Sequence, residues 1–419
     1  MRLDMTEGKP EFHGINLNSL RRSAEHLNGH ILSTPTIFAP SLSNLLGASL
    51  HLKLENLQYT SSFKTRGAFL ALKALSDEDK KAGVISMSAG NHAQALAFRS
   101  QQEKIKSTII MPEQTPFTKI SKTKAYGAEV VLSGRTLDEA EKIVDQLIDA
   151  NGYSLIHPFD NLNIISGQGT IGLEMMDSNP DLDYLIVPIG GGGLISGISI
   201  AAKSITPNIK IIGVESELYP SMSRSLAGLS PQSGGDTLAE GIAVKNPGFL
   251  TRPIVAELVD DIILVNEQQI EWAIGALIEH QRTISEGAGA AGLAAIYASQ
   301  KRFRNKRVGI IVCGGNIDSR LLGTILNRTL ISDGRLVRIR IGISDEPGML
   351  AKIAHTISQH QGNIIEVYHQ RLFYNVPAKL AKLDVVIETR GSNHAYDIIK
   401  TLKSIGFEVQ LLDEQFQSH

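Results

Sequence analysis

The chain lacks several features that mark specialised classes of protein. Only one of its 419 residues is a cysteine, Cys313, which excludes an intrachain disulfide framework and a metal site built on several cysteines. It has no run of about 18 apolar residues, so we expect no membrane-spanning helix. The net charge is -2 and like charges do not occur in blocks, so neither a nucleic-acid-binding surface nor a polybasic membrane patch is indicated. We expect a small-molecule partner.

What is present is typical of a globular protein. Hydrophobic residues make up 42% of the chain, charged residues 20% and aromatic residues 5%, which is close to the average for folded proteins apart from the few aromatics. The length predicts two or three compact units of about 100 to 200 residues each. Residues 1–14 lack the basic and apolar pattern of a signal peptide, so we expect a cytoplasmic protein.

Short apolar runs alternate with helical patterns over roughly residues 50–330. This alternation predicts an α/β fold with open, mostly parallel sheets, in two subdomains, the smaller at roughly residues 50–150. We assign residues 1–330 to one catalytic domain. The predicted strands are Val84 to Met87, Ser107 to Met111, Glu129 to Leu132, Tyr184 to Ile189, Ile209 to Val214 and Val308 to Val312.

The alternation of apolar runs and helical patterns changes after Leu330, so residues 331–419 are predicted to be a linker and a second domain. Residues 336–343 alternate apolar and polar side chains, as in a half-buried strand. Further strands are expected at Ile364 to Val367, Leu383 to Ile387 and Glu408 to Leu412, with a helix over Tyr396 to Leu402. The predicted order is βαββαβ, the ferredoxin-like arrangement.

The segment Ser61 to Ala68 (SSFKTRGA) places one lysine, Lys64, where a polar loop enters a helix. If Lys64 is buried, its amine loses charge and can form a Schiff base with an aldehyde. Taken alone, it is more simply interpreted as a solvated lysine at a helix end.

Two further loops follow predicted strands, where an open α/β sheet binds ligands. Ser88 to Gln94 (SAGNHAQ) opens a helix whose free amides could hold a carboxylate, although Ser88 or Asn91 could simply cap that helix. Gly190 to Leu194 (GGGGL) could wrap a phosphate with its backbone amides. Together the loops offer an aldehyde anchor, a carboxylate site and a phosphate site, as pyridoxal phosphate and an amino-acid substrate require.

These motifs, with EGAGAAG and CGGNID further on, lie in this order between residues 61 and 318. The chain resembles the threonine and serine dehydratases, of fold type II among the pyridoxal-phosphate enzymes. Residues 337–412 resemble an ACT domain, the amino-acid-sensing module at the C-terminus of biosynthetic threonine ammonia-lyases.

The resemblance implies a role for each matching residue. Lys64 would carry the cofactor and remove the substrate's α-proton. The cofactor would also contact a further set: Phe63, Asn91, Gly190, Gly191, Gly192, Gly193, Leu194 and Cys313. The substrate carboxylate would lie at Ser88, Ala89, Gly90, Asn91 and His92.

Two positions bear on the reaction type. Where the family usually has a serine beside the pyridine nitrogen, this chain has Cys313, a weak neutral partner that favours β-elimination over transamination; a buried core cysteine is the structural alternative. Related serine racemases carry a hydroxyl where this chain has Ala89, which cannot donate a proton. We therefore expect dehydratase activity with little racemisation.

The resemblance predicts a threonine ammonia-lyase that supplies 2-oxobutanoate for isoleucine synthesis, and a homotetramer. Its ACT domain would bind isoleucine or valine through Gly348, Met349, Leu350, Asn363 and Ile364. A purely interfacial ACT domain is the alternative for that module.

Other functions stay open at this point: a catabolic serine and threonine dehydratase, a serine racemase, or a non-catalytic amino-acid sensor. Glu286 with its neighbouring glycines could line a pocket, but close helix packing is the simpler interpretation. No metal site is predicted, since Glu215 lacks nearby acidic partners.

Overall fold

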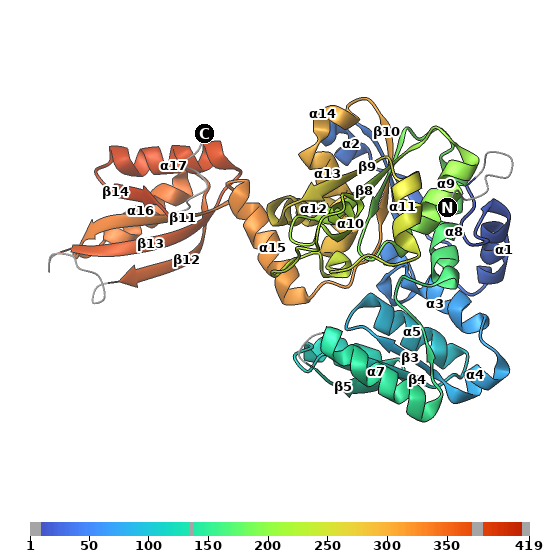
Figure 1. Ribbon diagram of the computed structural model, residues 1–419. Coiled ribbons are helices and arrows are strands. Elements are labelled where there is room, and N and C mark those ends of the chain that lie inside the picture. The colour runs from blue at the N-terminus through green and yellow to red at the C-terminus, as the bar shows by residue number, and fades with distance from the viewer. Residues whose placement is uncertain (1–9, 135–136, 371–379, 413–419) are drawn as a thin grey trace. The chain divides into compact units, whose positions relative to one another are not determined.

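A computed structural model describes residues 10–134, 137–370 and 380–412 of the chain, shown in Figure 1. It divides into two compact units, Met1–Ile317 and Asp318–His419. The predicted fold class is confirmed: the first unit contains two open sheets, and the second a small antiparallel one.

The larger sheet of the first unit has six strands in the order β1-β2-β10-β7-β8-β9. All neighbours pair in parallel except β1 and β2. The central strands are buried along almost their whole length, because helices cover both faces of a parallel sheet. The bounds are β1 Thr36–Phe38, β2 Ser49–Leu54, β7 Tyr184–Pro188, β8 Lys210–Ser216, β9 Asp261–Val265 and β10 Arg307–Val312.

The smaller sheet of the first unit has the order β5-β4-β3-β6, with every pair parallel. Its helices α5 and α7 are seen beside it in Figure 1. The strands are β3 Val84–Met87, β4 Ser107–Met111, β5 Glu129–Leu132 and β6 Ser154–Leu155, and the helices are α3 Lys64–Lys73, α4 Asp77–Ala82, α5 Asn91–Gln102, α6 Phe117–Ala125 and α7 Leu137–Asn151.

The remaining helices of the first unit belong with the six-stranded sheet. They are α1 Leu17–Leu27, α2 Pro40–Leu46, α8 Leu162–Ser178, α9 Gly193–Ile205, α10 Ser221–Leu226, α11 Thr251–Leu258, α12 Glu267–Gln281, α13 Gly287–Ala298 and α14 Gln300–Phe303. Short 3₁₀ turns occur at η2 Glu55–Leu57, η3 Tyr59–Ser61 and η4 Glu240–Ile242.

Helices α3 and α8 cross at two glycines. A Cβ atom added to Gly167 would lie 2.6 Å from the Cα atom of Gly67, so a side chain there would force the helices apart. Close beside this crossing, the buried Arg66 guanidinium binds Glu55 (Nη2 to Oε1, 2.7 Å) and Glu174 (Nη2 to Oε2, 2.9 Å). Because Arg66 and Gly67 lie two and three residues after Lys64, these contacts hold the first turn of the helix that carries the lysine.

The second unit has the predicted βαββαβ order. Its sheet runs β12-β13-β11-β14, and β11 pairs antiparallel with both β13 and β14. Strands β12 and β13 are longer than predicted, because their pairing with neighbouring strands continues beyond the predicted apolar segments. The elements are α15 Ser319–Ser332, β11 Leu336–Ser344, α16 Met349–Gln359, β12 Asn363–Gln370, β13 Leu380–Glu388, α17 Ser392–Ser404 and β14 Glu408–Leu411.

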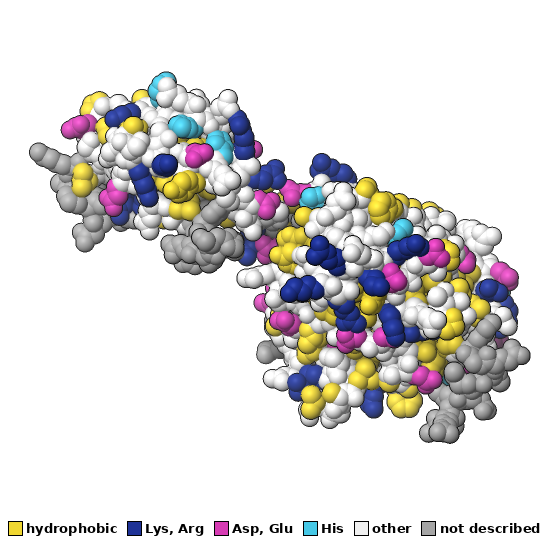
Figure 2. Space-filling model, turned by 90° about the horizontal axis from the view of Figure 1, so that it is seen from above, with side chains coloured by type: hydrophobic (Ala, Val, Ile, Leu, Met, Phe, Trp, Pro, Cys, Tyr) yellow, Lys and Arg dark blue, Asp and Glu magenta, His cyan; other side chains and the backbone are white. Residues whose placement is uncertain are grey.

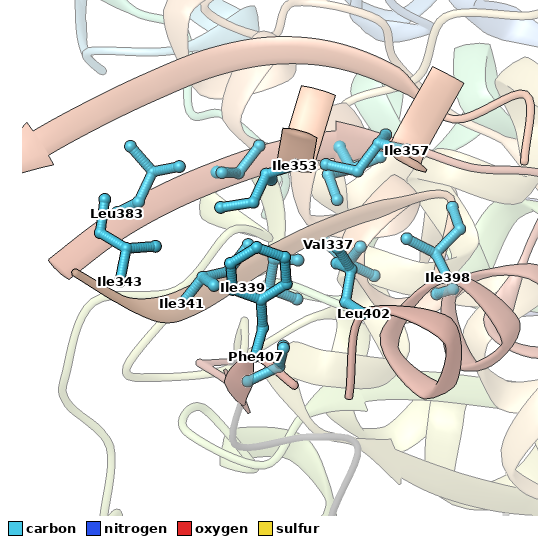
Figure 3. Packing of buried hydrophobic residues seen from close by; sticks show 14 of the residues in the cluster. Val337, Ile339, Ile341, Ile343, Ile353, Ile357, Leu383, Ile398, Leu402 and Phe407 are labelled. Carbon is cyan, nitrogen blue, oxygen red and sulfur yellow. The ribbon is translucent and has the colours of Figure 1, made fainter. Parts of the chain in front are cut away.

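The core of this second unit lies between the sheet and both helices. Figure 3 shows the isoleucines of β11 pointing toward Ile353 and Ile357 of α16 and toward Ile398 and Leu402 of α17. These side chains are at most 4% exposed. The second unit therefore has a hydrophobic core of its own.

The surface carries charges of both signs. On the face drawn in Figure 2, basic and acidic side chains are both spread among apolar ones. Among the described residues, no helix combines the length and apolar character needed to cross a bilayer.

Candidate active site

Lys64 begins helix α3. Its Nζ donates a hydrogen bond to the backbone oxygen of Pro158 at 2.8 Å. Removal from water lowers the pKa of the amine to about 8, and the nearby Cys313 and Glu286 oppose this shift only in part. The structure thus provides the easily deprotonated amine that Schiff-base chemistry needs.

The end of strand β10 lies beside the segment that leads into α3. The N–H of Phe63 donates to the backbone oxygen of Cys313 at 3.2 Å, and the N–H of Gly315 donates to the backbone oxygen of Ser61 at 2.9 Å. Cys313 is buried, and burial raises the pKa of its thiol well above the usual value. The fold therefore brings a neutral thiol to the lysine from the far end of the unit's sequence.

Asn91, the first residue of α5, is held from two sides. Its Nδ2 donates to Oε1 of Glu286 at 2.7 Å, and its Oδ1 accepts from Nδ2 of Asn316 at 2.8 Å. Burial raises the pKa of Glu286 to about 7, although the bond from Asn91 opposes this. Sequence analysis assigned no role to Asn316 and favoured packing for Glu286. Their neighbouring glycines do pack closely, but the Glu286 side chain lies in the site.

The glycine loop connects β7 to the 13-residue helix α9. Gly192 precedes the helix with a φ of 95°, which favours glycine. The backbone N–H groups of Gly191 to Leu194 donate to no acceptor among the described residues. With the positive end of the helix dipole, they form a site suited to a phosphate.

Residues 27–314 of the chain match the profile of a protein family described as "Pyridoxal-phosphate dependent enzyme". The chain belongs to this family. Pyridoxal phosphate is its cofactor, and the site just described fits it: Lys64 for the aldehyde, free amides for the phosphate, and Cys313 and Asn91 near the lysine.

Named relatives of this pyridoxal-phosphate enzyme extend the comparison. It is 40% identical over 400 residues to L-threonine ammonia-lyase of Thermotoga maritima, covering 95% of this chain and 100% of the relative. It is 41% identical over 328 residues to a Staphylococcus aureus (strain N315) protein named L-threonine dehydratase catabolic TdcB, covering 77% of this chain and 95% of that one.

A solved structure shares the fold. The crystal structure of serine racemase from Dictyostelium discoideum superposes with a TM-score of 0.68 at 39% identity, over 73% of this chain and 99% of that chain.

The loop predicted to hold the substrate carboxylate lies between β3 and α5 of the enzyme. The Ser88 hydroxyl accepts from the N–H of Gly90 at 3.3 Å, and Ala89 packs against the small subdomain's core. The His92 ring is buried, with Nε2 3.0 Å from the backbone oxygen of Ile156, and burial lowers its pKa to about 3. The His92 side chain is thus a neutral structural group. The backbone N–H groups of Ala89, Asn91 and His92 remain as candidate donors to the substrate carboxylate, since those of Ser88 and Gly90 are already bonded.

Residues 156–160 form a part of the site that sequence analysis missed. Three of them contact predicted site residues: Ile156 the ring of His92, Pro158 the amine of Lys64, and Phe159 the glycine loop. A Cβ atom on Gly191 would lie 2.2 Å from the Phe159 ring. No motif marks this segment, because its contacts are mostly made by the backbone.

Glu215 has a structural partner. Its carboxylate accepts from the N–H groups of Met222 and Ser223, at 2.7 and 3.0 Å, and so caps helix α10. Throughout the described ranges, no three His, Cys, Asp or Glu side chains gather as a metal ion would need.

The predicted effector residues lie at opposite ends of α16. Gly348, with a φ of 92°, caps the start of the helix, and Met349 and Leu350 are its first two residues, whereas Asn363 and Ile364 follow it and start β12. The helix has 11 residues and is about 16 Å long. One chain therefore does not bring the two groups together.

Proposed function

We propose that the chain is a lyase that converts L-threonine to 2-oxobutanoate and ammonia. The observation that carries this proposal is the 40% identity with an L-threonine ammonia-lyase over 95% of the chain. The buried amine of Lys64 supports it, since a pKa lowered to about 8 suits Schiff-base chemistry.

Bound pyridoxal phosphate supplies the conjugated ring that withdraws electrons from the substrate's α-carbon. The amides of Gly191 to Leu194 would hold its phosphate, and Asn91 its ring hydroxyl. The loop Ser88 to His92 would orient the substrate carboxylate. Lys64 would hold the cofactor's aldehyde, and its amine, with a pKa of about 8, would take the substrate's α-proton.

Elimination rather than racemisation follows from the residues around the ring. The Cys313 thiol, whose pKa burial raises, remains neutral and would offer the ring nitrogen only a weak partner. Ala89 has no proton to deliver to the opposite face. Since serine racemases share the fold, the absence of a hydroxyl at Ala89 is the feature that favours a dehydratase.

We place the reaction in isoleucine biosynthesis, with the second unit as a regulatory ACT domain. The similarity to the Thermotoga maritima protein includes this unit, whereas the match to the protein named catabolic covers 77% of the chain. A catabolic serine and threonine dehydratase is the second candidate, favoured by that protein's name.

Isoleucine or valine is the proposed effector. Because Gly348 and Asn363 lie at opposite ends of α16 in one chain, an effector that contacts both groups requires two chains. This separation supports an assembly through paired ACT domains, which we propose to be a homotetramer.

The test is 2-oxo acid formation from L-threonine and L-serine, with and without isoleucine. We expect turnover of threonine, inhibition by isoleucine, and a loss of about 10²- to 10⁴-fold in Lys64→Ala. Lys73→Ala, which removes an exposed amine from the same helix, is the matched control. No oxo acid from either substrate would refute the dehydratase, and an isoleucine titration without effect on activity or assembly would refute the regulation.

A further inference from the structure

Both polar atoms of the Asn91 side chain form hydrogen bonds. Its oxygen accepts from Asn316, and its nitrogen donates to Glu286. Asn316 donates from Nδ2 both to the backbone oxygen of Thr60, at 2.7 Å, and to Oδ1 of Asn91, at 2.8 Å. Asn91 donates in turn from Nδ2 to Glu286 at 2.7 Å. A backbone oxygen can only accept, so Thr60 determines which way the Asn316 amide faces.

We propose that Glu286 and Asn316 are positioning residues that fix the orientation of the Asn91 amide, and through it the hydrogen bond offered to the cofactor. The proposal rests on the function proposed above. Turning the Asn91 amide by 180° would place its NH₂ group against that of Asn316 and its oxygen against the Glu286 carboxyl. The correct orientation leaves Asn91 one N–H free for the ring hydroxyl of pyridoxal phosphate.

Glycines lie where the side chains of this hydrogen-bond network need space. A Cβ atom on Gly314 would lie 2.4 Å from Oε1 of Glu286 and 3.2 Å from Nδ2 of Asn91, and one on Gly241 would lie 3.1 Å from the same Oε1. Two glycines therefore provide the space for this carboxyl. The backbone N–H of Glu286 also donates to the oxygen of Gly314 at 3.1 Å, which anchors the residue itself.

The network joins segments that lie far apart in the sequence. Thr60 lies just before α3, Asn91 begins α5, Glu286 precedes α13 and Asn316 follows β10. Asn91 comes from the small subdomain, and Glu286 and Asn316 come from the large one. The network thus ties the cofactor's ring partner to the part of the unit that carries the phosphate loop.

Near-isosteric variants test the proposal. In the full-length protein, Glu286→Leu and Asn316→Leu remove an acceptor and a donor with little change of shape, whereas Glu286→Gln keeps an acceptor without the charge. The apoenzyme of each is titrated with pyridoxal phosphate, and the dissociation constant and the absorption spectrum of the bound cofactor are measured. Glu25→Ala, an exposed carboxylate on α1, is the control.

We expect each leucine variant to weaken cofactor binding about tenfold, as for one lost hydrogen bond, and to shift the absorption band. Glu286→Gln should restore most of both properties, because orientation needs an acceptor and not a charge. Thermal unfolding of each apoenzyme identifies variants that fail to fold. Where the leucine variants fail, Asn316→Asp decides, because it replaces the donor NH₂ by an acceptor of the same size and should also weaken cofactor binding.

Wild-type affinity and spectrum in folded leucine variants would overturn the proposal, as would a glutamine variant as weak as Glu286→Leu. A wild type that binds pyridoxal phosphate but does not deaminate threonine would refute the proposed function and leave this inference standing.

Discussion

At the scale of single residues, burial decides the chemistry of Lys64. From sequence, a solvated lysine at a helix end was the simpler interpretation, because a motif does not state how much water surrounds a side chain. In the fold, desolvation lowers the pKa of the amine to about 8. The same effect raises the pKa of Glu286 to about 7, so both groups change protonation near neutral pH.

The rate of cofactor capture should follow the protonation of Lys64. Only the neutral amine attacks an aldehyde, so the rate at which apoenzyme takes up pyridoxal phosphate should rise with pH and level off above about 8. Stopped-flow absorbance over pH 6 to 10 measures it. A midpoint near the ordinary lysine value of 10.5 would show that the amine is not desolvated.

The pH dependence of stability should reveal Glu286. An acid whose pKa is raised from 4.5 to about 7 binds more protons in the folded state, so its contribution to stability falls as pH rises between these values and is constant above them. Glu286→Gln should therefore gain stability relative to wild type as pH rises from 5 to 7. Urea unfolding at each pH measures this, and a difference independent of pH would contradict it.

At the scale of elements, the first turn of α3 depends on a buried group of charges. Arg66 binds two carboxylates, and Lys53 adds an ion pair to Glu174 at 2.5 Å. Arg66 lies in the SSFKTRGA motif, but its partners come from η2 and α8 and have no sequence signature. Without the arginine, Glu55 would be a buried carboxylate that lacks its cation.

Arg66→Leu should lower the free energy of unfolding by about 3 to 5 kcal/mol, because it leaves a buried charge uncompensated. Urea unfolding followed by circular dichroism measures the loss. The control is Arg307→Ala, which removes an exposed ion pair with Asp181 and should cost less than about 1 kcal/mol. Equal losses in the two variants would contradict the argument.

At the scale of the whole molecule, the chain has two units with separate cores. The buried residues of the second unit's core come mainly from β11, β13, β14, α16 and α17, and Ile364 of β12 packs against them. The match to the pyridoxal-phosphate family ends at residue 314, close to the division at Ile317. The match to the family therefore lies entirely within the first unit.

Leu383→Ala tests this independence. Leu383 is 0% exposed within the small core, so the substitution should destabilise the second unit by about 2 to 5 kcal/mol. The rate of threonine deamination by Leu383→Ala, measured without isoleucine, should remain that of wild type. Calorimetry and the activity assay together measure both effects, and a proportional loss of deamination and of the second unit's stability would contradict independent cores.

The sequence alone determined the fold class, the cofactor and the order of elements, because strand periodicity and glycine-rich loops act over a few neighbouring residues. It did not reveal β1, β2, β6 and β9, whose short or mixed patterns become strands only beside paired neighbours. Tertiary structure alone decided the partners of Asn91 and Arg66, the role of residues 156–160 and the protonation of Lys64. These depend on burial and on contacts between distant segments, which no local pattern encodes.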